Sequence, residues 1–252
     1  MFEILKTRRQ QKYRTFSYPD GPAPSLPERF AGRPEITPGC PQGCRQCVDV
    51  CPVGAVLAPS EADAPCIDTG RCLFCRACEK ACPRQAIVFS GEHRLAASRR
   101  QDLVVGAGSP QVPVDERAAR LFGRSLKLRQ VSAGGCSACE ADCNVLNTLA
   151  WDIGRFGIQF VASPRHADGL LITGPVTANM RLALEKTHQA VPEPRIVIAV
   201  GACAISGGPC VDHPEVCNGA DGIVPVDLYV PGCPPHPLTI LDGLLRLLGR
   251  IY

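Results

Sequence analysis

The cysteine spacing between residues 40 and 90 restricts the fold of this chain more than any other feature of its sequence. Nine of the 16 cysteines lie there, most of them separated by two or three residues. The pattern C-R-x-C-x3-C-P-x2-A occurs twice, beginning at Cys44 and again at Cys75. Thiols this close together suit one shared metal centre better than several separate disulfide bridges. The repeat therefore predicts a module with two equivalent metal sites related by a pseudo-twofold axis.

The second run, C-x2-C-x2-C-x3-C-P over residues 72–83, matches the bacterial ferredoxin pattern for [4Fe–4S] clusters. The first run, over residues 40–52, has one extra residue in its first gap, within a loop that contains Gly39 and Gly43. In two-cluster ferredoxins the fourth cysteine of each run binds the other cluster. The predicted ligands are Cys40, Cys44, Cys47 and Cys82 for the first cluster, and Cys72, Cys75, Cys78 and Cys51 for the second.

Two structural zinc sites built from C-x2-C knuckles are the alternative for this region. The proline after each fourth cysteine and the two interleaved quartets favour iron–sulfur clusters, because zinc requires neither feature. Cys66 fits neither run. We expect it to be a small buried apolar side chain, as free cysteines commonly are.

Residues 125–252 alternate short β-branched runs with helical patterns, which predicts an α/β fold with a parallel sheet. Two of the runs are almost continuously apolar, as buried parallel strands are. The expected strands are Ser125–Val131, Gly169–Thr173 and Arg195–Val200. The expected helices are Ala141–Trp151, Thr177–Gln189 with Thr177 as its N-cap, and an amphipathic closing helix over Leu238–Leu248.

Four further cysteines stand in turns rich in glycine or proline, namely Cys136, Cys139, Cys203 and Cys233. Cys136 and Cys203 each follow a predicted strand, which places them at the same edge of a parallel sheet. From spacing alone, these four either bind one metal centre or are scattered core thiols. The three remaining cysteines, Cys143, Cys210 and Cys217, are expected not to be ligands, although Cys143 lies one helical turn from Cys139.

Three segments of residues 125–252 carry a strong resemblance, namely GRFGIQFVASPRHAD, VPEPRIVIAVGACAISGG and IVPVDLYVPGCPP. They resemble the small electron-transfer subunit shared by respiratory complex I and membrane-bound (group 4) [NiFe] hydrogenases. The resemblance implies a flavodoxin-like fold and a third [4Fe–4S] cluster, bound by Cys136, Cys139, Cys203 and Cys233. Complex I proteins are expected to carry two adjacent cysteines at the first position. The C-S-A-C-E of residues 136–140 is similar to the hydrogenase branch instead.

The same resemblance implies a partner for this cluster. In the family the cluster lies against a large subunit, which holds nickel and iron in hydrogenases and meets quinone in complex I. Glu140, beside Cys139, is a candidate for contact with a proton or with that partner. The alternative is that its carboxylate is favoured simply by the N-terminus of a helix.

Residues 1–105 resemble the dicluster ferredoxin subunit of formate hydrogenlyase, through F-A-G-R-P-E at 30–35 and G-R-C-L-F-C at 70–75. The chain thus looks like a fusion of two subunits. The expected organisation is a basic, proline-rich arm over 1–39, a dicluster ferredoxin domain over 40–90, a linker over 91–124 and a flavodoxin-like domain over 125–252.

Charge and apolar content argue against several other classes of protein. A net charge of +3 is too balanced for a nucleic-acid-binding surface. The longest apolar stretch, Ile196–Ile205, is about half of the ~20 residues that span a bilayer. Arg8-Arg9 is not followed by the apolar region of an export signal. We therefore expect a cytoplasmic protein whose basic tail contacts a partner or an anionic lipid surface, or is a solvated arm.

The sequence contains no dinucleotide, Walker or flavin motif, no catalytic triad and no paired nickel-binding C-x2-C motifs. We therefore do not expect catalysis by this chain alone. The resemblance implies an electron-transfer subunit with three [4Fe–4S] clusters in a membrane-associated, formate-hydrogenlyase-like complex. Its implied partners are a [NiFe]-hydrogenase-type large subunit, membrane-embedded subunits that attach it to the inner membrane, and a soluble electron donor or formate dehydrogenase module. The alternatives are a subunit of a complex-I-like NADH or ferredoxin:quinone oxidoreductase, and a zinc-bound assembly module.

Overall fold

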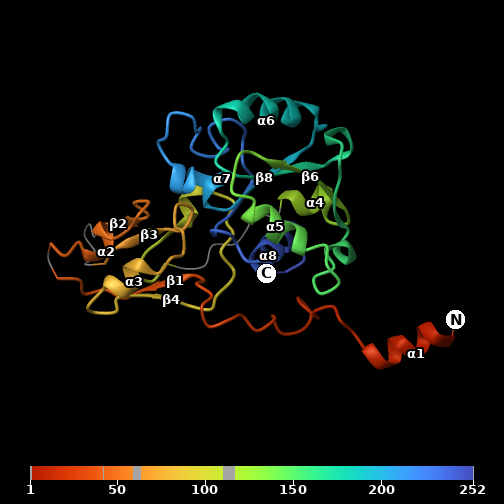
Figure 1. Ribbon diagram of the computed structural model, residues 1–252, viewed down its shortest axis with the longest axis horizontal. Helices are drawn as coiled ribbons and strands as arrows, with labels where there is room; N and C mark the ends of the chain where they lie inside the picture. Colours follow the sequence, from red (N-terminus) through yellow and green to blue (C-terminus); the bar gives the residue numbers. More distant parts are fainter. Residues whose placement is uncertain (1, 42, 59–63, 110–116, 252) are drawn as a thin grey trace.

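The computed structural model describes residues 2–41, 43–58, 64–109 and 117–251, and it places a ferredoxin-like domain beside an α/β domain (Figure 1). Within these residues the α/β domain is built on a five-stranded parallel sheet in the order β10-β9-β8-β6-β7. Its strands are β6 (Leu126–Ser132), β7 (Ile158–Phe160), β8 (Gly169–Thr173), β9 (Ile196–Val200) and β10 (Leu228–Val230). All residues of β8 and β9 are buried, as the central strands of a covered sheet must be.

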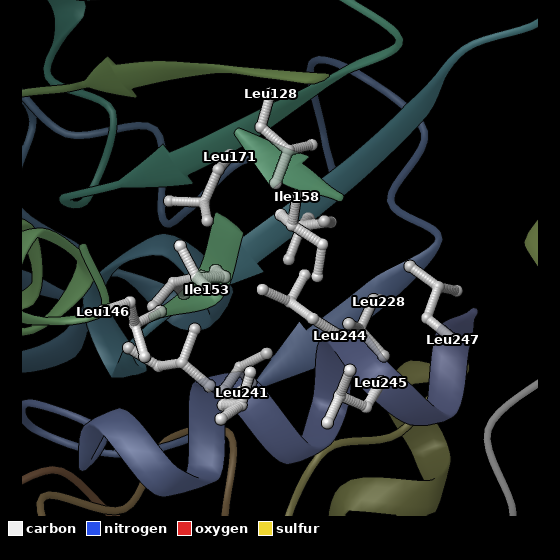
Figure 2. Close-up of a cluster of buried hydrophobic side chains, with 14 of the residues drawn as sticks. Leu128, Leu146, Ile153, Ile158, Leu171, Leu228, Leu241, Leu244, Leu245 and Leu247 are labelled. Carbon is white, nitrogen blue, oxygen red and sulfur yellow. The ribbon is translucent and has the colours of Figure 1, made fainter. Parts of the chain in front are cut away.

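Helices cover both faces of the sheet, with α6 on one face and α5 and α8 on the other (Figure 1). Because successive side chains of a strand point to opposite faces, Leu170 and Ile172 pack into the α6 side of the core, whereas Leu171 packs into the α8 side. Figure 2 shows Leu171 directed toward the leucines of α8. The helices are α4 (Arg117–Phe122), α5 (Ala138–Val145), α6 (Ala178–Ala190), α7 (Ala202–Ser206) and α8 (Pro237–Leu247).

The predicted α/β fold with a parallel sheet is confirmed. β8 has the predicted bounds, and β9 begins one residue later than predicted. β7 and β10 were not predicted, because three residues are too few for a periodic pattern to show. α6 follows Thr177 as expected, but the Thr177 hydroxyl donates to Asn179 Oδ1 (2.6 Å) and does not cap the helix. The predicted extent of the preceding helix is wrong, since α5 ends at Val145 and not at Trp151.

The predicted closing helix forms as α8, but every residue of α8 is buried, so its polar side does not meet solvent. The face expected to meet solvent is covered by two distant segments of the chain. Tyr18 of the N-terminal arm donates from Oη to Asp242 Oδ1 (2.8 Å). Arg246 donates from a terminal guanidinium nitrogen to the Ala96 carbonyl oxygen (3.3 Å). A Cβ at Gly243 would lie only 2.8 Å from Ala96 Cβ, so the chain leaving the ferredoxin-like domain packs directly on this helix.

The ferredoxin-like domain has two small antiparallel sheets, β1-β4 and β2-β3-β5, around the short helices α2 and α3. β1 lies inside the segment predicted as an arm, and β5 lies inside the segment predicted as a linker. Both segments therefore complete sheets of this domain. The elements are β1 (Pro34–Ile36), α2 (Gln46–Asp49), β2 (Val56–Leu57), β3 (Cys66–Asp68), α3 (Ala77–Ala81), β4 (Ile87–Phe89), the 3-10 helix η1 (Arg100–Leu103) and β5 (Val104–Val105).

The two domains meet along the chain that joins them. Ala97 N donates to the Tyr229 carbonyl (3.0 Å) and Tyr229 N donates to the Ala97 carbonyl (2.9 Å), which adds an antiparallel bridge beside β10. The N-terminal helix α1 (Phe2–Gln11) projects from the body of the molecule instead (Figure 1). None of the helices in the described part of the chain is long and apolar enough to cross a membrane.

Candidate iron–sulfur sites

The first predicted quartet is brought together at the start of α2 and the end of α3. Cys47 is buried in α2. Burial raises the pKa of its thiol, and the charges of nearby Cys40, Cys82 and Cys44 raise it further. The thiols of Cys40, Cys44 and Cys82 therefore lie within electrostatic range of Cys47. This grouping, drawn from two separate cysteine runs, supports the interleaved ligand set, which stays a prediction.

The second predicted quartet lines one small, largely apolar pocket. Cys51, Cys72, Cys75 and Cys78 all contribute to its wall, together with apolar side chains such as Val53 and Phe89. Burial raises the pKa of Cys72 to about 12 and that of Cys78 to about 11, and neighbouring thiolates add to both shifts. Four converging thiols in an apolar enclosure fit a [4Fe–4S] cluster, since metal binding would remove the cost of holding these sulfurs as thiolates.

The repeated C-P-x2-A pattern has a structural explanation. Ala55 N donates to Cys51 Sγ (3.1 Å), and Ala86 N donates to Cys82 Sγ (3.3 Å). The residue before each alanine, Gly54 or Gln85, has a left-handed backbone with φ of 60° and 51°. This bend directs the amide back at the sulfur. Amide donors of this kind stabilise thiolate charge and tune a cluster's potential.

In the part of the chain that the structure describes, no three or more His, Cys, Asp or Glu side chains are arranged for a single metal ion. In a [4Fe–4S] cluster each thiolate binds a different iron, so the four sulfurs enclose a larger volume than the ligands of one zinc do.

The third quartet forms at the carboxyl edge of the parallel sheet. Cys136 follows β6, Cys203 follows β9 in α7, Cys233 follows β10, and Cys139 lies in the first turn of α5. Burial raises the pKa of Cys203 to about 11, and the charges of Cys233 and Cys136 contribute. Burial raises the pKa of Cys139 as well, with Cys203 the largest of the neighbouring charges that contribute. The expectation that Cys136 and Cys203 share one edge of the sheet agrees with this arrangement.

Two glycines leave the room that these sulfurs occupy. A Cβ at Gly201 would lie 2.5 Å from Cys139 Sγ, and a Cβ at Gly208 would lie 2.7 Å from Cys203 Sγ. Both have positive φ, 92° and 57°. Only glycine combines this backbone with this close approach. The surroundings of the third quartet therefore fit a bound cluster, which supports the ligand set that the resemblance implies.

Glu140 is fixed by two strand ends. Its Oε1 accepts hydrogen bonds from Ser132 Oγ (2.6 Å) and Thr173 Oγ1 (2.7 Å), which end β6 and β8. Burial opposes its ionisation, but these two hydrogen bonds together with one from the backbone N–H of Glu140 outweigh burial and hold the pKa of the carboxyl below its usual value. The sequence did not point to Ser132 or Thr173. Glu140 ties α5 to the sheet, and its role as a proton or partner contact stays a prediction.

The cysteines outside the quartets differ in their surroundings. Cys143 is fully buried, and burial raises its pKa to about 12. Cys210 is exposed and contributes to the electrostatic environment of Cys203, so it is a fifth thiol near the third quartet. Cys66 is half-buried in β3, less buried than expected, and Cys217 is half-buried as well.

The second and third quartets are neighbours across the domain junction. Burial raises the pKa of Cys233, and the charges of Cys136 and of Cys75, which belongs to the second quartet, raise it further. Ser206, in the same helix as Cys203, donates from Oγ to the Gly70 carbonyl (3.1 Å), two residues before Cys72. The sequence could not reveal this junction, because it brings together residues more than 130 positions apart.

The fold and the cysteine sites define an iron–sulfur protein of the electron-transfer class. Residues 136–247 match the family described as NADH ubiquinone oxidoreductase, 20 Kd subunit, and residues 39–86 match the 4Fe-4S dicluster domain. The chain is 40% identical over 141 residues to the probable membrane-bound hydrogenase subunit mbhJ of Pyrococcus furiosus, covering 55% of this chain and 84% of that protein. It belongs to the NADH ubiquinone oxidoreductase 20 Kd subunit family, with a dicluster ferredoxin-like domain preceding the family's α/β domain.

Two further relatives represent the two branches of the resemblance, one a hydrogenase-type complex and the other an NADH-quinone oxidoreductase. Formate hydrogenlyase subunit 7 of Escherichia coli is 47% identical over 128 residues, which cover 51% of this chain and 50% of that protein. An NADH-quinone oxidoreductase subunit of Clostridium beijerinckii is 44% identical over 118 residues, covering 46% of this chain and 70% of that protein. The chain therefore spans only half the length of the formate hydrogenlyase relative.

Proposed function

We propose that this chain is the electron-transfer subunit of a membrane-associated, formate-hydrogenlyase-like [NiFe]-hydrogenase complex, with three [4Fe–4S] sites in series. Each bound cluster would supply one-electron chemistry at its site. The ligands are Cys40, Cys44, Cys47 and Cys82 for the first site, Cys51, Cys72, Cys75 and Cys78 for the second, and Cys136, Cys139, Cys203 and Cys233 for the third.

The observation that carries this proposal is the hydrogen bond from Ser206 Oγ to the Gly70 carbonyl oxygen (3.1 Å), which ties the helix carrying Cys203 to the turn before Cys72. Ferredoxin sites that served a separate purpose would have no need to lie beside the third site. Here the thiols of the second quartet lie near those of the third, and the first quartet shares α3 with the second. The series runs from the ferredoxin-like domain into the α/β domain, whose exposed Cys136 is available to a large subunit.

Elemental analysis of anaerobically purified protein tests the number of sites. We expect about twelve iron atoms per chain, because each of three clusters holds four. About eight iron atoms with an unaltered ferredoxin signature would contradict the third site. Zinc in place of iron, with no visible absorption, would support the assembly-module alternative and overturn the electron-transfer proposal.

The partner decides between a hydrogenase and a complex-I-like enzyme. The C-x2-C spacing of Cys136 and Cys139 favours the hydrogenase branch. The similarity to the NADH-quinone oxidoreductase relative supports the second candidate, a quinone-linked complex. We expect the large subunit that co-purifies with the chain to contain nickel, together with membrane-embedded subunits that attach the chain peripherally to the membrane. A nickel-free large subunit that reduces quinone would overturn the hydrogenase assignment while leaving the electron-transfer role intact.

A further inference from the structure

The N-terminal helix α1 makes no core contact, although it carries large apolar side chains. Every residue of α1 is described, and none is buried. Phe2, Ile4 and Leu5 are 87%, 73% and 59% exposed, and Tyr13 just beyond the helix is 85% exposed. A ten-residue helix is marginal by itself in water. A surface outside this chain that covered these side chains would stabilise it.

The positive charge of the whole chain is concentrated in this segment. Residues 2–14 contain five basic side chains and one acidic one, a net charge of +4. The rest of the chain contains 22 basic and 23 acidic residues, a net charge of −1. The segment is therefore a local cationic feature on an otherwise balanced protein, and a surface that binds it through charge must be anionic.

The pattern around α1 does not suit a groove on a protein. A helix that fits such a groove presents apolar anchors at i, i+3, i+4 and i+7. Counting from Phe2, position i+3 is Leu5, but i+4 is Lys6 and i+7 is Arg9. Basic and apolar side chains are thus mixed around the axis. Lys and Arg side chains accommodate this mixture at an anionic lipid surface, because their stems lie against apolar groups while their charged ends reach the phosphates.

The body of the protein holds the segment at its C-terminal end. Thr15 Oγ1 donates to the Leu149 carbonyl oxygen (2.8 Å), and Phe16 N donates to the Ala150 carbonyl oxygen (2.9 Å). The Phe16 ring packs edge-on against Trp151, with ring centroids 5.0 Å apart. Leu149 is 69% exposed and lines an open hollow together with Ile4 and Tyr13 of the segment. Leu149 therefore extends the apolar part of this surface onto the α/β domain.

We propose that residues 2–14 bind the anionic headgroups of a lipid bilayer directly. This contact is additional to any attachment through partner subunits, and it does not depend on the identity of the large subunit. Because the apolar side chains do not form a separate face, binding rests mainly on charge. It is expected to require anionic lipid and to weaken as salt shortens the range of the attraction.

Vesicle co-sedimentation of the full chain, with its clusters intact and under anaerobic conditions, tests the proposal. The vesicles are pure phosphatidylcholine or phosphatidylcholine mixed with phosphatidylglycerol. We expect binding only to the mixed vesicles, and loss of binding in high salt. The combined variant Lys6→Gln, Arg8→Gln, Arg9→Gln should bind roughly 100-fold more weakly, because each basic side chain near an anionic surface contributes a several-fold factor.

The matched control removes the same charge elsewhere. Lys127→Gln, Arg181→Gln, Lys186→Gln alters exposed residues of the α/β domain and should keep wild-type vesicle binding. Unchanged visible absorption of both variants shows that the clusters and the fold are retained. Equal binding by the two variants, equal binding to pure phosphatidylcholine, or no binding of the wild type to mixed vesicles would overturn the proposal. So would an N-terminal variant that keeps vesicle binding but loses its partner subunits, because the occupant would then be an acidic protein surface.

Discussion

At the scale of single residues, the sites depend on glycines, which have no side chain, as much as on the cysteines that would bind the clusters. Gly201 and Gly208 bring backbone close to two sulfurs of the third quartet, where any Cβ would collide. In the ferredoxin-like domain, the alanine after each C-P-x2 turns its amide onto a cysteine sulfur. These positions carry no ligand, yet they decide whether four thiols have room for a cluster.

Replacing Gly201 with alanine should abolish the third site alone. The new Cβ would lie 2.5 Å from Cys139 Sγ on a backbone with φ of 92°, so both a collision and strain oppose it. We expect about four of about twelve iron atoms to be lost, with the ferredoxin signals in electron paramagnetic resonance unchanged. Gly222→Ala is the control, because a Cβ there meets nothing within 4 Å. Full iron content in Gly201→Ala would show that the third site is elsewhere.

At the scale of elements, α8 is the structural centre of the molecule. Its residues are all buried, because the N-terminal arm and the chain around Ala96 cover the face that the α/β core leaves open. The covering contact is a buried hydrogen-bonded chain in which Tyr18 and Arg246 both donate to Asp242, each at 2.8 Å. Arg155 also donates to the Tyr18 carbonyl oxygen (2.6 Å). The arm is thus held on the domain by a buried hydrogen-bonded set, in which Asp242 accepts from both Tyr18 and Arg246.

The link between Tyr18 and Asp242 gives a pH dependence that can be measured. Burial, and then the charge of Asp242, raise the pKa of Tyr18 above its usual value of 10.0. Because the folded-state pKa is the higher one, this stabilisation is complete below pH 10 and is lost as the pH rises further. At neutral pH, Tyr18→Phe should lower the free energy of unfolding by about 1.5–3 kcal/mol through loss of a buried hydrogen bond to a charged group. Thermal unfolding of the two proteins should converge above pH 10. A difference that stays constant across this range would contradict the assignment.

At the scale of the whole molecule, the domain junction determines how the ferredoxin-like domain relates to the third quartet. Gly70 packs against Ile205 of α7, and Ser206 bonds to its carbonyl oxygen. Asp68 holds the same turn by accepting from Gly70 N (3.0 Å) and from Arg100. The turn that leads into Cys72 is therefore fixed on one side by the ferredoxin-like domain and on the other by the helix that carries Cys203.

Enlarging Gly70 should separate the second and third sites without removing either one. A Cβ there would lie 2.8 Å from Leu103 Cδ1 and 2.9 Å from Ile205 Cγ2, so we expect the larger side chain of Gly70→Val to displace Ile205 and widen the junction. We expect full iron content, weaker magnetic coupling between the second and third clusters, and slower reduction of the third. Gly91→Val is the control, since a Cβ at Gly91 meets nothing within 4 Å. Unchanged coupling in Gly70→Val would mean that this contact does not set the separation.

The cysteine repeat by itself predicts the two interleaved ferredoxin quartets, because ligand spacing within a run is a local property of the chain. The β-branched runs likewise predict β8 and β9, since buried parallel strands are apolar throughout. Only the tertiary structure gathers the third quartet from four turns, buries all of α8 and joins Gly70 to Ser206 through a hydrogen bond. These features could not be predicted locally, because each depends on which distant surfaces pack together. Burial and domain contact are properties of the packed molecule, whereas the spacing of ligands within a run is set by residues that are close together in the sequence.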